Sequence, residues 1–207
     1  MPKKILFALM VAAQLAVPSW MIYSMESVIA KGEPWLFKTA PVDPYDLFRG
    51  RYVALGFEQG NVNYKGTEIF FSGQKVYALL EKDAEGFARV RDLAVKKPAG
   101  VPAASACLTA RVLYHQFIEY DYTDPEKPVE KKVNVVQIRF PFDRFYMNET
   151  KAPEAEALYR RANEAGPASN AHAEVRVLNG RAAIRELFVN GRPAAAVLEE
   201  NAASTAR

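Results

Sequence analysis

The sequence is poor in the residues that build disulfides and metal sites. Its 207 residues include one cysteine, Cys107, and two histidines, His115 and His172. A single cysteine cannot form an intrachain disulfide and leaves no cysteine-rich zinc site. Two histidines also argue against a multi-histidine metal centre. We therefore expect no metal and no other cofactor.

The sequence also lacks a large excess of charge of either sign. Its 27 Lys and Arg against 24 Asp and Glu give a formal net charge of +3, which is small for a protein that coats nucleic acid. The pairs Lys96-Lys97 and Lys131-Lys132 are isolated, which is typical of solvated surface. Half of the residues are hydrophobic, enough for a sizeable core. We expect a folded domain with no nucleic-acid partner.

Charge is absent from one long stretch near the start. Ile5–Met25 holds 21 residues without a charged side chain, directly after two lysines. In a helix this stretch would rise about 31 Å, close to the hydrocarbon thickness of a bilayer. Trp20 and Tyr23 lie near its far end, where aromatic residues favour the headgroup layer. The stretch predicts a transmembrane helix that contacts lipid through residues 5–25.

Two other interpretations of this segment are a cleaved signal peptide and a buried helix of a soluble protein. Val28-Ile29-Ala30 fits a small-residue cleavage pattern, but the apolar run is longer than a usual signal-peptide core and has no polar face. We expect a retained membrane anchor over residues 1–30. The lysines before it favour a cytoplasmic amino terminus, which would put the rest of the chain in the periplasm, anchored in the inner membrane.

From residue 31 onward, short runs rich in Val, Ile, Tyr and Phe alternate with turn residues, which is typical of strands. Asn179-Gly180 favours a type I′ hairpin turn. The expected fold class is mainly β (α+β), an antiparallel β-rich extracytoplasmic domain over 31–198. We expect a subdomain boundary near 96–104 and a flexible tail over 199–207. The expected strands are Trp35–Thr39, Tyr52–Glu58, Glu68–Phe71, Lys75–Glu81, Ala88–Ala94, Leu108–Tyr122, Lys132–Phe140, Glu174–Leu178 and Ala182–Val189.

The body should also contain one helix, beginning after Thr150 and ending before Gly166-Pro167. Its apolar residues recur at spacings of three and four, which predicts a face packed on the sheet. These residues are Ala155, Leu158, Tyr159 and Ala162.

The run Tyr114–Tyr122 is long for one strand, so we expect it to bend or bulge. Its tyrosines alternate with other residues and would share one face. We expect that face to be sheet core. If exposed, it would suit a protein partner or a glycan strand.

The segment Pro41–Tyr52 is dense in residues with special backbone or charge properties. Its prolines restrict the backbone, Asp43 and Asp46 can accept N–H bonds, and Arg49 can bridge a carboxylate. Gly50 suits a turn into the next strand. The segment is either a rigid, internally bonded corner or a platform for a ligand or partner.

This segment resembles the signature of the GDYXXLXY-domain family, bacterial membrane-anchored proteins without an established activity. The naming motif aligns with Gly50, Arg51, Tyr52, Leu55 and Phe57. Arg51 stands where the family has Asp, which argues against a role that needs a carboxylate there, and Phe57 stands where it has Tyr. The stretch Phe145–Glu149, with Tyr146 and Glu149, also looks like a family feature. The resemblance implies an envelope location and partnership with multispanning membrane proteins.

No catalytic pattern stands out. Ser72 and Lys75 could form a Ser/Lys pair, but Ser72-Gly73 is more simply a turn. We expect a binding or assembly module for a membrane-protein partner or envelope ligand, and not an enzyme. The alternatives are an envelope hydrolase of Ser/Lys type, which needs a serine hydroxyl beside a buried lysine, and a structural spacer.

Overall fold

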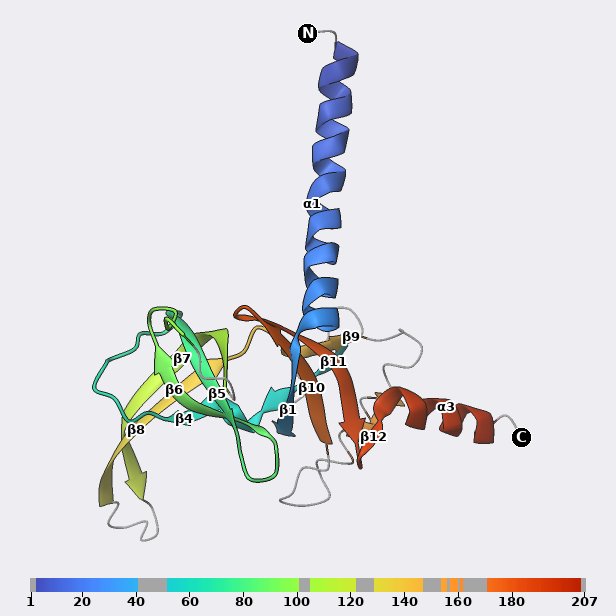
Figure 1. Ribbon diagram of the computed structural model, residues 1–207. Coiled ribbons are helices and arrows are strands. Elements are labelled where there is room, and N and C mark those ends of the chain that lie inside the picture. The colour runs from blue at the N-terminus through green and yellow to red at the C-terminus, as the bar shows by residue number, and fades with distance from the viewer. Residues whose placement is uncertain are drawn as a thin grey trace.

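The structure is a computed structural model of the chain. It describes residues 3–40, 52–100, 105–121, 129–146, 154–155, 157–159, 161 and 171–205. A long amino-terminal helix leads into a body made mainly of antiparallel strands (Figure 1). The expected fold class is confirmed.

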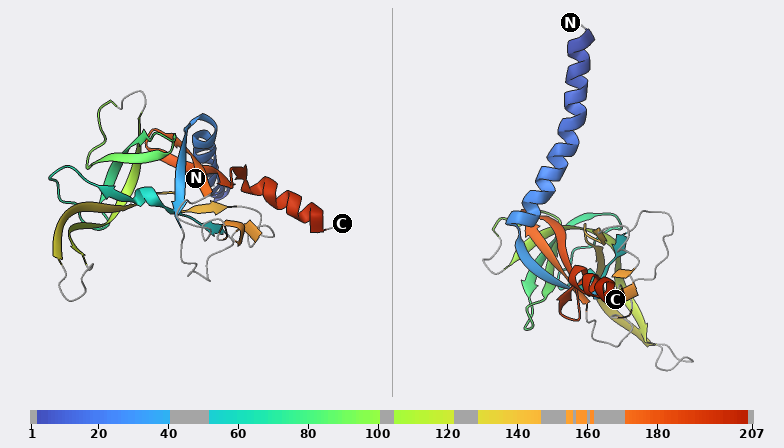
Figure 2. Two further views of the ribbon diagram at one scale, coloured as in Figure 1. Left: turned by 90° about the horizontal axis from the view of Figure 1, so that it is seen from below. Right: turned by 90° about the vertical axis from the view of Figure 1, so that its right-hand side faces the viewer.

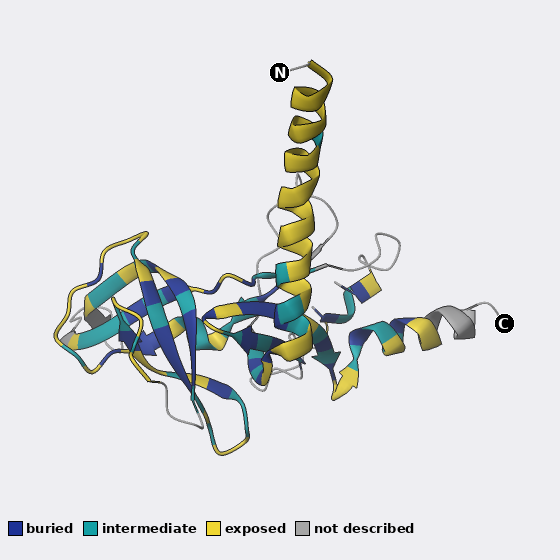
Figure 3. Cartoon of the chain, turned by 45° about the horizontal axis from the view of Figure 1, so that its top comes forward, coloured by how far each residue is buried: buried dark blue, intermediate teal, exposed yellow. Residues whose placement is uncertain are grey.

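Helix α1 (Lys3–Lys31) continues through Pro18 and buries only Val28. Figure 3 shows it exposed along nearly its whole length. It is the one helix among the described residues that is long and apolar enough to cross a membrane, and a signal sequence would share these properties. The predicted long apolar helix is confirmed.

The body contains two five-stranded antiparallel sheets and a separate two-stranded pair. The first sheet has the order β12 (Arg192–Pro193), β11 (Arg181–Val189), β10 (Ala171–Leu178), β1 (Glu33–Ala40), β3 (Gly56–Phe57). The second, strongly curved in Figure 1, has the order β4 (Asn61–Asn63), β8 (Val129–Arg139), β7 (Ala106–Asp121), β5 (Lys75–Lys82), β6 (Ala88–Ala94). Strands β2 (Tyr52–Ala54) and β9 (Arg144–Tyr146) form the pair, η1 (Glu58–Gly60) precedes β4, and α3 (Ala194–Thr205) ends the described chain.

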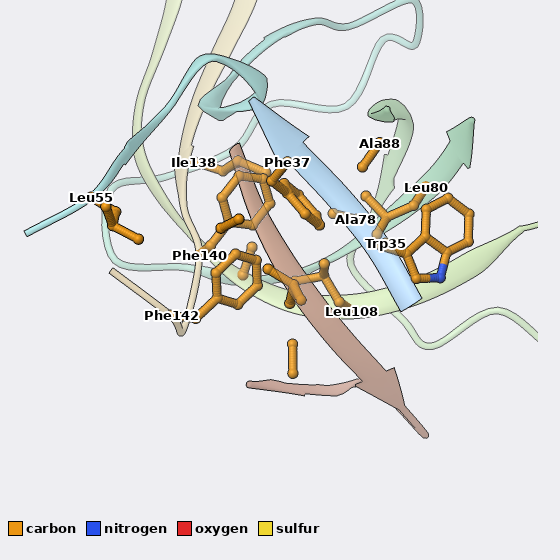
Figure 4. Packing of buried hydrophobic residues seen from close by; sticks show 14 of the residues in the cluster. Trp35, Phe37, Leu55, Ala78, Leu80, Ala88, Leu108, Ile138, Phe140 and Phe142 are labelled. Carbon is orange, nitrogen blue, oxygen red and sulfur yellow. The ribbon is translucent and has the colours of Figure 1, made fainter. Parts of the chain in front are cut away.

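One hydrophobic core joins the sheets (Figure 4). Trp35 and Phe37 on β1 are fully buried, as are Leu80 on β5 and Leu108 on β7. The alternation of β10 puts every second residue into this core. Because β1 directly follows α1, the apolar helix continues into a central element of the core.

Of the expected strands, Ala88–Ala94 has its predicted bounds and six others are shifted by at most three residues. The expected strand Tyr52–Glu58 is divided into β2 and β3, which pair with different strands. Glu68–Phe71 is not a strand, so that prediction was wrong: Phe70 is buried, whereas Ile69 and Phe71 are exposed. The Phe70 N–H is bonded to the His115 side chain instead of a strand partner. Helix α3 and the short strands β4, β9 and β12 were not predicted from the sequence.

Among residues 154–161, those described are helical, and Ala155 and Tyr159 are buried in the core, as their spacing predicts. Thr150 and Ala162 lie outside the described residues. The turn at Asn179-Gly180 has φ values of 53° and 86°, which confirms a turn with both central residues at positive φ.

Strand β7 is long and irregular, as predicted. Its pairing with β8 shifts between Val112 and Tyr114 and again between Gln116 and Ile118. The first shift leaves Tyr114 47% exposed, so the expectation that this tyrosine lies in the core was wrong. A bulge exchanges the faces of a strand, and alternation in the sequence does not reveal it.

Candidate functional site

The predicted site residues fall into three groups. Asp43, Asp46, Arg49, Gly50, Arg51 and Glu149 lie outside the described residues. For Tyr52 and Tyr146 the structure describes the strand backbone. Leu55 and Phe57 are described in full.

The backbone joins two of the stretches that carry the predicted motif. Strand β2 pairs antiparallel with β9, and Tyr52 lies directly opposite Tyr146. The Leu55 N–H extends this connection by donating to the Asp143 carbonyl over 2.9 Å. Residues about ninety positions apart in the sequence therefore form one local unit.

The chain then changes partners between Leu55 and Phe57. Strand β2 pairs with β9, whereas β3 pairs with β1, with Phe57 opposite Thr39. Thr39 is fully buried, and its hydroxyl donates to the Ala171 carbonyl over 2.9 Å. We call residues 52–57 together with β9 the signature junction, because they connect the two-stranded pair to the first sheet.

Four phenylalanines hold this junction in the core. Phe57 meets Phe142 edge-to-face with ring centroids 5.2 Å apart, and Phe37 meets Phe142 at the same distance. Phe140 and Phe142 are stacked at 5.3 Å. Such pairs add stability beyond the burial of apolar area. Of the predicted site residues, Leu55 and Phe57 thus have packing roles.

The packing role of Phe140 and Phe142 was not predicted from the sequence. They flank Pro141, two positions apart, and project into the same core (Figure 4). A period of two is the available signal, but the proline between them concealed it, because proline usually marks the end of a central strand.

The signature junction lies at the helix side of the body. In Figure 1 and in the right panel of Figure 2, β9 is at the level where α1 ends. Strand β9 also lies close to β11, which α1 contacts.

The joint between α1 and the body has no linker. Gly32 is the single residue between α1 and β1, and its N–H bonds to the Val28 carbonyl. Nη1 of Arg176 donates to the Gly32 carbonyl over 3.1 Å, and Nη2 of Arg181 donates to the Ser24 hydroxyl over 2.8 Å. The body is therefore attached to the last turns of the helix by both backbone and side-chain bonds.

His115 has both ring nitrogens engaged. The Phe70 N–H donates to Nδ1 over 3.1 Å, so Nε2 carries the proton and donates to the Asn134 side-chain oxygen at 2.6 Å. Asn134 in turn donates to the Gly66 carbonyl. The ring thus fixes the segment before β5 and is not available as a catalytic base.

His172 and Cys107 are also internal groups. His172 stacks on Phe188 with centroids 5.0 Å apart, and burial lowers the pKa of its imidazole. Cys107 is buried, and desolvation raises the pKa of its thiol. Burial disfavours the Cys107 thiolate, the form in which a cysteine acts as a nucleophile or metal ligand. The His172 ring is kept neutral and packed against Phe188.

The Ser/Lys pair does not have the geometry of a hydrolase. Ser72 is exposed on a turn, and Lys75 is exposed with its ammonium 5.5 Å from the centre of the Tyr77 ring. A Ser/Lys nucleophile needs a desolvated lysine amine, which Lys75 does not provide. Among the described residues, no group of three or more His, Cys, Asp or Glu side chains could hold a metal ion.

The family model described as GDYXXLXY protein matches residues 14–187, which spans the end of α1, the signature junction and most of the body. No curated protein and no solved structure matches the chain.

Proposed function

The chain belongs to the GDYXXLXY family, and we propose that it is a single-pass inner-membrane protein that binds or assembles with a multispanning membrane protein. In this proposal α1 is a retained anchor, the amino terminus is cytoplasmic and the body is periplasmic. The Asp43–Phe57 segment and β9 form the contact surface for the partner.

One observation carries the proposal: an exposed apolar helix continues into the central strand β1 with only Gly32 between them. A helix that spans lipid from residue 5 to residue 25 leaves six residues, about 9 Å of helix, between the hydrocarbon and the body. A body held so close to the bilayer lies within reach of other membrane proteins.

The position of the signature junction supports the same partner class. Tyr52 lies opposite Tyr146 in the pair of β2 and β9, and β9 is at the level of the body where α1 ends. Tyrosine is common at protein interfaces because it combines a large apolar ring with a polar group. The charged residues Asp43 and Arg49 precede this pair in the sequence and would supply specificity.

Site-directed photocrosslinking in native membranes tests the proposal. A photoreactive phenylalanine analogue at position 52 should crosslink to a multispanning membrane protein. The same analogue at Ala84, on the β5–β6 turn that points away from α1, should not. The double variant Asp43→Ala/Arg49→Ala should reduce the crosslink at position 52 while the protein still resists alkaline extraction from the membrane.

Three outcomes would contradict the proposal in distinct ways. Release of the protein by alkaline extraction would show that α1 is not a membrane anchor. Equal crosslinking from positions 52 and 84 would show that the Asp43–Phe57 segment and β9 are not the contact surface. An anchored protein with no crosslink at either position would favour the structural spacer.

A further inference from the structure

Three basic residues form a row across the second sheet. Lys75 on β5 lies directly opposite Arg111 on β7, and Arg111 lies directly opposite Arg139 on β8. Residues directly opposite in neighbouring strands point to the same face, so the three side chains stand side by side. All three are exposed. We call Lys75, Arg111 and Arg139 the cation row.

No carboxylate among the described residues neutralises the cation row. The Arg111 guanidinium donates to the Gly73 carbonyl over 3.0 Å, the Lys75 ammonium lies over the Tyr77 ring, and Arg139 has no side-chain bond in the described part of the chain. Like charges directly opposite one another destabilise a sheet. Three in succession indicate that an anion from outside the chain compensates them.

The cation row lies beside exposed apolar side chains. Phe71 and Ile69 are 71% and 61% exposed, and Phe71 precedes by two residues the glycine that Arg111 binds. The Gln74 N–H bonds to the Phe71 carbonyl and the Phe71 N–H bonds to the Gln74 side chain, which fixes this turn. A basic surface beside exposed aromatic and aliphatic residues is typical of proteins that lie on a lipid headgroup layer.

The row also lies on the correct side of the molecule. Strand β5 begins with Lys75, and this end of the strand lies on the side of the body from which α1 extends. The β5–β6 turn, at the other end of the strand, points away from α1 (Figure 1). The turn between β10 and β11 reaches the same level, and there Arg181 contacts Ser24 of the helix. A bilayer that surrounds α1 would therefore run along this end of the second sheet.

We propose that the cation row binds the phosphate groups of anionic phospholipids in the membrane that holds α1, with Phe71 and Ile69 in the headgroup layer. The inference rests on the proposed function, because it requires α1 to span a bilayer. Lipid binding by the cation row would attach the body to the membrane at a second place, on the second sheet, in addition to α1. Two attachments would fix the orientation of the body for a membrane partner.

Lipid-dependent fluorescence quenching on the full chain in nanodiscs tests this inference. A polarity-sensitive fluorophore is attached at Ser72→Cys, since Cys107 is buried and its thiol is disfavoured for labelling. Headgroup nitroxide lipids should quench it strongly in bilayers of phosphatidylglycerol and phosphatidylcholine, and at least threefold less in phosphatidylcholine alone. The same fluorophore at Ala84→Cys should not respond to bilayer charge.

Charge variants give the second arm of the experiment. Lys75→Gln/Arg139→Gln keeps the Arg111 bond to Gly73 and should lower the quenching at position 72 severalfold, since each basic residue near an anionic surface contributes about fivefold in binding. With no anionic lipid present, removing opposed like charges should also raise the Tm by about 2–4 °C. The matched variant Arg91→Gln/Lys132→Gln removes an exposed arginine and lysine outside the row and should leave the quenching unchanged.

The contrary outcomes separate this inference from the proposed function. If the protein resists alkaline extraction but position 72 is quenched no more than position 84, the cation row does not contact lipid although the anchor stands. Loss of the lipid dependence when inorganic phosphate is added at constant ionic strength would identify free phosphate as the anion and overturn the lipid assignment. If α1 does not integrate into the bilayer, both proposals fail.

Discussion

Nη2 of Arg181 donates a hydrogen bond to Oγ of Ser24 over 2.8 Å, which joins the start of β11 to the last turns of α1. Ser24 is the penultimate residue of the uncharged run that ends at Met25. The body therefore reaches back along the helix as far as the end of its apolar segment. Together with the bond from Arg176 to Gly32, this contact joins the helix to the first sheet.

Gly32→Ala should destabilise the body by about 1–3 kcal/mol through overpacking. A methyl group at this position would lie 2.4 Å from the Val28 carbonyl oxygen and 2.9 Å from Cβ of Arg176. Neither neighbour can move without shifting the helix or β10. Chemical denaturation in detergent measures the change in the free energy of unfolding.

Gly191→Ala is the control for backbone strain. Its methyl group would meet no atom within 4 Å, but its φ is 74°, so the free energy of unfolding should fall by about 1–2 kcal/mol from backbone strain alone. A Gly32→Ala protein as stable as the natural one would show that the helix is not packed on the sheet.

Phe57→Ala should lower the free energy of unfolding by about 2–4 kcal/mol, because it removes the ring that packs between Phe37 and Phe142. Phe57→Tyr, the residue expected in the family motif, keeps the ring and should cost less than about 1 kcal/mol. Phe71→Ala is the matched control, since Phe71 is 71% exposed and should change stability by less than about 0.5 kcal/mol. Urea titrations compare the three variants, and equal effects at 57 and 71 would refute the packing role.

His115→Phe should cost about 1–3 kcal/mol although it preserves the ring contact with Phe117 at 4.1 Å. Stability would fall because the Phe70 N–H and the Asn134 side-chain oxygen would each lose the hydrogen bond that they make with the His115 ring. Hydrogen exchange should show faster exchange at the Phe70 amide. Asn134→Ala should have a smaller effect there, because it leaves the bond from Phe70 to the ring in place.

The ion pair between Lys38 and Glu85 connects β1 to the β5–β6 turn over 2.6 Å. A double-mutant cycle with Lys38→Met and Glu85→Gln should give a coupling energy of about 0.5 kcal/mol, because Glu85 is 66% exposed and solvent screens the pair. The coupling should shrink in 1 M salt. A coupling energy that salt does not change would point to packing of Lys38 on Phe87 as its source.

The stability of the body should fall on mild acidification because of His172. Its imidazole titrates near 6.5 in the unfolded chain, and burial lowers this pKa in the folded protein. The unfolded state therefore binds more protons below about pH 6.5, and the free energy of unfolding decreases as the pH falls from there toward the lower folded pKa. His172→Phe keeps a ring on Phe188 and should remove this part of the pH dependence. Denaturation curves at pH 8 and pH 5 measure it, and equal slopes with pH for both proteins would contradict the assignment.

Local sequence patterns were sufficient for the elements whose environment is uniform. The uncharged run of α1 predicts a long apolar helix without knowledge of its tertiary contacts. Its length and composition suit only lipid or another wholly apolar environment. Positive φ at Asn179 and Gly180 also follows from residue type, because both residues tolerate the left-handed region. Strand β6 has the predicted bounds because turn residues in the sequence mark its ends.

The tertiary structure decided which distant residues meet. No local pattern pairs Tyr52 with Tyr146, aligns Lys75 with Arg111 and Arg139, or turns Tyr114 outward after a bulge. Pairing register depends on long-range packing of both strands and shifts by one residue wherever a bulge relieves strain. The apolar run at the start of this chain could thus be read from the sequence, whereas the signature junction and the cation row exist only once the sheets have closed on their shared core.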